Sequence, residues 1–179
     1  MEHDGYVTHE GCDHIFFVGF LGAGKSTLAR NLGRLYRRTY VDTDRMAERL
    51  LRKTVRECFE QDGESAFRDA ETRVLEQLRA EKSLLVSCGG GIVERDGNCA
   101  LMHEMGVVVF LDGDLSDSLR QMQHPEKRPD LGICDVEELY WRRRPLFKHA
   151  ADYVIDIRDK SFLEVAEVAG NLLWEEGLI

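Results

Sequence analysis

Residues 19–27 read Gly19-Phe20-Leu21-Gly22-Ala23-Gly24-Lys25-Ser26-Thr27 and begin at the last residue of the apolar run "IFFVG" at 15–19. This stretch matches the phosphate-binding pattern G-x-x-x-x-G-K-[ST] between a predicted strand and a predicted helix. Glycines let successive backbone N–H groups surround phosphates, and the start of the helix adds partial positive charge. We therefore expect the loop to bind ATP or a related nucleotide through Gly22, Ala23, Gly24, Lys25, Ser26 and Thr27.

Within this loop, two side chains have separate tasks. Lys25 can reach the terminal phosphates, and the hydroxyl group of Ser26 can bind Mg²⁺. ATP and Mg²⁺ are therefore the expected substrate and cofactor.

Outward from the loop, short apolar runs alternate with amphipathic stretches. The apolar runs are "IFFVG", "YVD", "LLVSC", "VVVFLD" and "YVIDI". We expect helices from about residue 25, within 45–80, near 97–105, in the segment that ends at 150, and at 161–175. Five strands alternating with helices predict a three-layer α/β fold with a doubly wound parallel sheet. Ligands of such sheets bind beyond the carboxyl ends of the strands.

Composition limits the remaining possibilities. A chain of 179 residues fits one domain, and we expect a flexible tail at 1–14 followed by a single domain at 15–179. The net charge of -9 disfavours nucleic acid as a partner, and no apolar run is long enough to predict a membrane span. Five widely spaced cysteines indicate reduced thiols, so a cytoplasmic protein is expected.

Motifs that are missing separate the classes of nucleotide-binding protein. A GTPase switch needs N-K-x-D and D-x-x-G, and neither pattern occurs in the chain. A mechanical ATPase usually has a strand that ends in adjacent acids, whereas the candidate strands here end in "SCGGG" and "FLDGD". The mechanical ATPase is therefore the weaker possibility, and the class of small-molecule kinases is favoured.

Two acids follow the second predicted strand, in the sequence Asp42-Thr43-Asp44. Asp42 can hold Mg²⁺, and Asp44 can orient or deprotonate an acceptor hydroxyl group. Alternatively, one of the two is the N-cap of the helix that follows.

The next polar pair is Arg68 and Glu71, which are neighbours on one face of a predicted helix. Such a pair can fix an arginine fork for a carboxylate ligand, although a surface ion pair explains the spacing equally well.

Three consecutive glycines, Gly89, Gly90 and Gly91, follow the run "LLVSC". A stretch without side chains at a strand end lets the backbone approach a ligand, so we expect Gly90 to contact the acceptor. The alternative is a tight turn, which explains three glycines less readily. Cys88 is expected to be a small packed residue rather than a nucleophile.

The order of these motifs, with R-P and then R-x-P-L-[FY] after them, resembles the shikimate kinases, over about residues 15–179. The resemblance implies transfer of the ATP γ-phosphoryl group to the 3-hydroxyl of shikimate, with a helical substrate-binding region and a lid at about 122–136. We expect a monomer. The resemblance also implies that Asp42 assists the metal and that Arg128 of the lid binds ATP and assists catalysis. Asp44, Arg68, Gly90 and Arg143 would hold shikimate, with Phe59, Phe67 and Glu71 shaping the pocket.

In the stretch "WRRRPLF", three arginines precede Pro145. The spacing of the family selects Arg143 as the inward one, so Arg142 and Arg144 are expected to face solvent. The stretch that follows Arg128 departs from the usual family pattern, and Ala29 replaces a usual glycine. Two rivals remain, a gluconate-type kinase and a non-catalytic nucleotide-binding regulatory domain.

Overall fold

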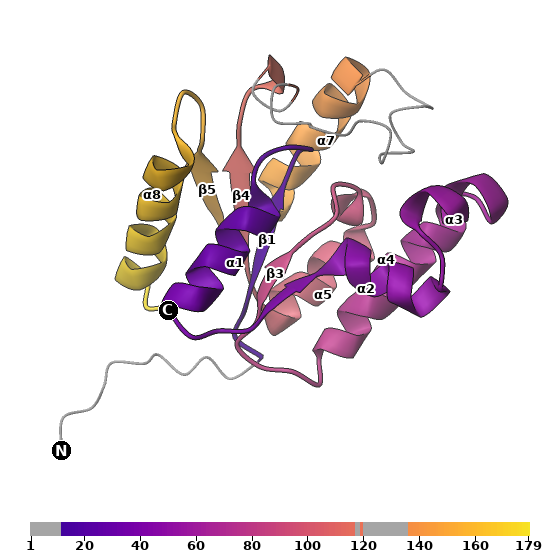
Figure 1. The fold of residues 1–179 in the computed structure, drawn as a ribbon, viewed down its shortest axis with the longest axis horizontal. Coiled ribbons are helices and arrows are strands. Elements are labelled where there is room, and N and C mark those ends of the chain that lie inside the picture. Colours follow the sequence, from indigo (N-terminus) through magenta and orange to yellow (C-terminus); the bar gives the residue numbers. More distant parts are fainter. Residues whose placement is uncertain (1–11, 117–118, 120–135) are drawn as a thin grey trace.

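The computed structural model describes residues 12–116, 119 and 136–179. Within these residues the chain forms a five-stranded, all-parallel sheet with the strand order β2-β3-β1-β4-β5 (Figure 1). The strands are β1 (His14–Gly19), β2 (Tyr40–Asp42), β3 (Leu85–Ser87), β4 (Gly106–Asp112) and β5 (Tyr153–Asp156). The predicted doubly wound α/β fold is confirmed.

Helices cover both faces of the sheet. Helices α1 (Lys25–Leu35) and α8 (Phe162–Glu175) contribute to the core on one face. On the other face lie α4 (Glu64–Leu78), α5 (Asp96–Met105) and α7 (Val136–Ala150). The helices α2 (Thr43–Leu51) and α3 (Val55–Gln61) pack with α4 around a third, smaller core beside the sheet (Figure 1).

The central strand β1 explains why two cores form. Phe16 and Val18 point into the core with α4, α5 and α7, whereas Ile15 and Phe17 point into the core with α1 and α8. All four side chains are at most 1% exposed. A parallel strand that is buried on both faces needs this continuous apolar run.

Strand register brings the expected functional positions to one edge. Asp42 at the end of β2 is paired with Ser87 of β3, and Ser87 is paired with Phe17 of β1. On the other side of β1, Gly19 is paired with Leu111, one residue before the end of β4. The phosphate loop, the acids after β2 and the glycines after β3 therefore share the carboxyl edge of the sheet.

Several boundaries differ from the sequence-based expectation. His14 was expected in a solvated tail but begins β1 and is buried, because its ring nitrogens bridge the carbonyl of Leu78 and the N–H of Leu84. Helix α2 begins at Thr43, two residues earlier than expected, because the side chain of Asp42 accepts a hydrogen bond from the backbone of Arg45.

Two predicted features fall largely outside the described residues. These are most of the tail, 1–11, and the lid at about 122–136, of which Val136 is described and begins α7. Arg128 belongs to the part of the lid outside the description. Among the helices that the structure describes, none has the length and apolar character needed to cross a membrane.

Candidate active site

The phosphate loop is shaped by its backbone. Gly22 and Gly24 have φ angles of 74° and 81°, in the left-handed region that favours glycine. Gly24 is the N-cap of α1 and provides no side-chain cap, so the first N–H groups of the helix are left for a ligand. This arrangement suits an anion such as a phosphate group.

Lys25 and Ser26 begin α1 and face different partners. The Lys25 amine donates to the carbonyls of Gly19 and Phe20 at 2.8 and 2.9 Å, which holds it over the loop. The Ser26 hydroxyl lies 3.0 Å from a carboxylate oxygen of Asp42 and 2.9 Å from the hydroxyl of Ser87. Asp42 thus serves both as helix N-cap and as a partner of the loop.

The oxygens of Ser26 and Asp42 are a fit for Mg²⁺. A hydroxyl and one carboxylate suit an ion that takes its other ligands from water and phosphate oxygens. No cluster of three or more His, Cys, Asp or Glu side chains that could hold a metal occurs in the described part of the chain.

The glycine triplet lies against three charged side chains, and each glycine leaves room for a different one. A Cβ atom at Gly89 would lie 2.1 Å from a carboxylate oxygen of Asp44, and one at Gly91 would lie 2.1 Å from the guanidinium of Arg68. A Cβ atom at Gly90 would lie 3.3 Å from the guanidinium of Arg143. Asp44, Arg68 and Arg143 thus converge on three consecutive residues.

Arg68 is held by two acids and is 6% exposed. It donates to Glu71 at 2.7 Å and to Glu64 at 2.9 and 3.2 Å, and the rings of Phe59 and Phe67 lie 5.9 Å from its guanidinium carbon. Burial acts to lower the pKa of Arg68, but the two carboxylates raise it above the usual value. The ion pair between Arg68 and Glu71 is therefore buried and is not a surface ion pair.

Glu71 is fully buried, and one of its carboxylate oxygens has no hydrogen-bond partner among the described residues. Burial raises its pKa to about 7, against the opposing effect of Arg68. That oxygen lies 3.1 Å from the same Cβ position at Gly89 that meets Asp44. The two carboxyl groups therefore occupy neighbouring space above Gly89.

Among the three arginines before Pro145, Arg143 has a fully buried side chain. Its Nε donates to Glu94 at 2.6 Å, and Arg142 donates to the same oxygen at 3.1 Å from a more exposed position. The expectation that Arg144 faces solvent is wrong. Arg144 donates two hydrogen bonds, at 2.8 and 2.9 Å, to the carboxylate of Asp112, the last residue of β4.

The comparisons with known proteins agree with this geometry. Residues 21–173 match the family model for shikimate kinase. The chain belongs to the shikimate kinase family. The shikimate kinase of Prochlorococcus marinus (strain NATL2A) is 33% identical over 168 residues, which cover 91% of this chain and 84% of that protein. The shikimate kinase of Vibrio parahaemolyticus is 34% identical over 166 residues, covering 90% and 96%.

Solved shikimate kinases also share the fold. The structure of the Acinetobacter baumannii enzyme in complex with shikimate has a TM-score of 0.84 and 30% identity, and covers 91% of this chain and 93% of that chain. The Aquifex aeolicus shikimate kinase has a TM-score of 0.76 and 27% identity, with coverage of 92% and 98%.

Sequence reasoning missed three side chains of this shikimate kinase site, namely Ser87, Glu94 and Asp112. Glu94 lies in the short 3-10 turn η1 (Ile92–Glu94), directly after the glycine triplet. Ser87 and Asp112 end β3 and β4, so their positions at strand ends were a usable signal. The partners of Glu94 lie 48 and 49 residues away, and no local pattern indicates them.

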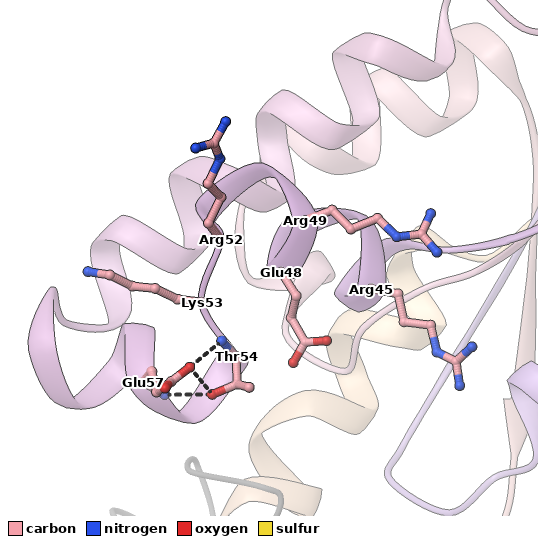
Figure 2. A pocket seen from close by; sticks show the side chains of 7 residues that line it. All are labelled: Arg45, Glu48, Arg49, Arg52, Lys53, Thr54 and Glu57. Carbon is pink, nitrogen blue, oxygen red and sulfur yellow. Dashed lines mark hydrogen bonds between the residues drawn. The ribbon is translucent and has the colours of Figure 1, made fainter.

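A shallow pocket of about 490 Å³ lies between α2 and α3 (Figure 2). Its cationic side chains point in different directions, and none of the side chains that converge on the glycine triplet lines it. The candidate active site is therefore the packed group of side chains at the strand ends, not this pocket. The pocket is lined by Arg45, Glu48, Arg49, Arg52, Lys53, Thr54 and Glu57.

Proposed function

We propose that this chain transfers the γ-phosphoryl group of ATP to the 3-hydroxyl group of shikimate, giving shikimate 3-phosphate and ADP. One observation carries the proposal. Arg68, Arg143 and Asp44 converge on the glycine triplet at the same sheet edge as the phosphate loop. Two arginines for a carboxylate and one acid for a hydroxyl match a small hydroxylated carboxylic acid.

On the nucleotide side, the backbone of 22–27 and the amine of Lys25 bind the ATP phosphates. That amine donates to two loop carbonyls, and neutral carbonyls are weaker partners than phosphate oxygens. Ser26 and Asp42 would hold Mg²⁺, which when bound supplies positive charge next to the phosphates.

On the acceptor side, Arg68 and Arg143 bind the carboxylate of shikimate, and Gly90 lets its ring approach the backbone. Asp44 accepts the proton of the 3-hydroxyl group as the hydroxyl oxygen attacks the γ-phosphorus. The bond from that phosphorus to the oxygen it shares with the β-phosphate then breaks, and ADP leaves. Orientation and charge stabilisation suffice for this reaction, so no covalent enzyme intermediate is needed.

The remaining assignments follow the family pattern. Arg128 would act from the lid, at about 122–136, against the ATP phosphates, where a cation stabilises developing charge. A single chain can supply all of the proposed substrate contacts, and we infer a monomer as the active unit. Odd, widely spaced cysteines and the use of ATP support a cytoplasmic location.

The test measures ADP release with shikimate, gluconate and nucleoside monophosphates as acceptors, each at saturating Mg²⁺-ATP. We expect acceptor-dependent ADP release with shikimate alone, and ³¹P NMR should show the phosphate on the 3-hydroxyl group. Turnover of gluconate instead would support the rival kinase. ATP binding without ADP release for any acceptor would support a regulatory domain.

A further inference from the structure

The carboxylate of Glu94 contacts Arg143, one of the two arginines proposed to bind the carboxylate of the substrate. Its Oε1 accepts hydrogen bonds from Nε of Arg143 and from Arg142, and its side chain is 21% exposed. Burial acts to raise the pKa of Glu94, but Arg143, Arg68 and Arg142 lower it below the usual value. A charged carboxylate is thus placed among three arginines.

The neighbourhood already contains enough negative charge to balance its cations. Among the described residues that meet here, the cations are Arg68, Arg142 and Arg143, and the carboxyl groups belong to Asp44, Glu64, Glu71 and Glu94. A further carboxylate from the substrate must compete with one of these groups. A buried guanidinium without a counter-charge is costly, so Arg143 needs such a group while the acceptor is absent.

Glu94 is the carboxylate best placed to give way. Asp44 and Glu71 are packed against Gly89, and Glu64 bonds Arg68 from the neighbouring turn of the same helix. Glu94 instead has a second partner, Arg142, whose side chain is 45% exposed. It can therefore move away from Arg143 and keep an ion pair at the surface.

We propose that Glu94 is a displaceable counter-ion of Arg143 that lowers the affinity of the enzyme for the carboxylate of its acceptor. The inference rests on the proposed function. When shikimate binds, its carboxylate takes over the interaction with Arg143, and Glu94 shifts toward Arg142. Glu94 thereby sets the concentration of acceptor at which the enzyme is half-saturated, without contacting the reacting atoms.

The variant Glu94→Gln separates charge from geometry. A glutamine oxygen can still accept the hydrogen bond from Arg143, so the arginine keeps its orientation while the competing charge is removed. A charge-assisted hydrogen bond is roughly twice as strong as a neutral one, so we expect KM for shikimate to fall about five- to tenfold. The value of kcat and KM for ATP should stay within about twofold.

Arg142 supplies a second, independent measurement. Arg142→Ala removes the exposed arginine with which Glu94 would pair after it leaves Arg143. Glu94 should then stay on Arg143 more strongly, and KM for shikimate should rise about two- to fivefold in the wild-type background. In the Glu94→Gln background the same substitution should change KM for shikimate by less than about 1.5-fold, because residue 94 then has no charge that could pair with Arg142. Glu104→Gln, which discharges an exposed acid paired with Arg79, is the matched control and should leave KM unchanged.

The outcomes distinguish the alternatives. A rise in KM for shikimate in Glu94→Gln would show that Glu94 only positions Arg143 and would overturn the proposal. Equal effects of Arg142→Ala in the two backgrounds would overturn it as well. If the wild-type enzyme shows no turnover of shikimate, the proposed function fails instead, and that result is visible before any variant is compared.

Discussion

The phosphate loop and the acceptor site lie at the same edge of the sheet but differ in construction. The loop is one run of residues, 19–27, whose shape comes from glycine backbone angles and an uncapped helix start. The acceptor site gathers side chains from Asp44 to Arg143 against the glycine triplet. A loop shaped by its own backbone angles keeps its geometry when side chains outside the loop are substituted. A site made of side chains that pack on one another changes its geometry when any one of them is substituted. Substitutions in the acceptor site should therefore affect shikimate much more than ATP.

The largest expected effect is that of Asp44→Asn. An amide cannot accept the hydroxyl proton, so kcat should fall about 10²- to 10⁴-fold. The affinity for ATP should remain near that of the wild type, because the loop around Lys25 holds the nucleotide. Steady-state kinetics combined with nucleotide titration measures both values. Near-normal turnover would remove Asp44 from its assigned role.

A pH-dependent stability is expected from Glu71, whose pKa is raised to about 7. Between its unfolded value of about 4.5 and 7, the folded chain holds more protons than the unfolded chain, so the free energy of unfolding falls as pH rises through this window. The loss is on the order of 3 kcal/mol. Urea unfolding at several pH values should show it.

Glu71→Gln provides the control for this pH dependence. The variant has no titrating group at this position, so its free energy of unfolding should decline less than that of the wild type between pH 4.5 and 7. Parallel curves for the two proteins would mean that folding does not raise the pKa of Glu71.

The substitution Arg68→Lys keeps the charge and loses the planar fork that bonds Glu64 and Glu71. We expect kcat/KM for shikimate to fall about ten- to hundredfold, since a charge-assisted contact contributes about 1.5–3 kcal/mol. Arg142→Lys is the control, because it keeps a charge on the exposed side of Glu94 and should resemble the wild type. Equal losses in both variants would contradict the assignment of Arg68.

The glycine triplet can be tested position by position, because none of its members has a positive φ angle and alanine probes space alone. Gly91→Ala places a Cβ atom 2.1 Å from the guanidinium of Arg68 and should lower kcat/KM for shikimate about tenfold or more. Gly90→Ala, with 3.3 Å to Arg143, should lower it only a few-fold. The reverse order would show that Gly90 has the tighter contact.

The smallest expected effect belongs to Arg144→Lys, which replaces a two-bond contact with Asp112 by a single one. The free energy of unfolding should fall by about 0.5–1 kcal/mol, measured by urea denaturation. Kinetic constants for ATP should not change. A variant as stable as the wild type would mean that this pair contributes nothing to anchoring α7.

The sequence was sufficient wherever function depends on local structure. The phosphate loop and the five strands follow from motif and pattern. The spacing of Arg68 and Glu71 predicted that they are neighbours but left open whether the pair is buried, and the family resemblance selected Arg143 as the inward arginine. The sequence was insufficient where a contact joins distant segments. Glu94 contacts Arg143 of α7 across 49 residues of sequence, and Arg144 was misjudged because its partner Asp112 lies 32 residues earlier, at the end of β4. Contacts between residues so far apart leave no repeating pattern in the sequence from which they could be predicted.

We propose that the nucleotide is held by the backbone of the phosphate loop and shikimate by the side chains packed against the glycine triplet. Calorimetric titration of Arg143→Lys with shikimate, and separately with ADP, tests this proposal most directly. We expect the dissociation constant for shikimate to rise about ten- to hundredfold, as loss of a charge-assisted fork requires, while that for ADP stays within about twofold. A parallel loss of affinity for both ligands, or an unchanged affinity for shikimate, would contradict the account.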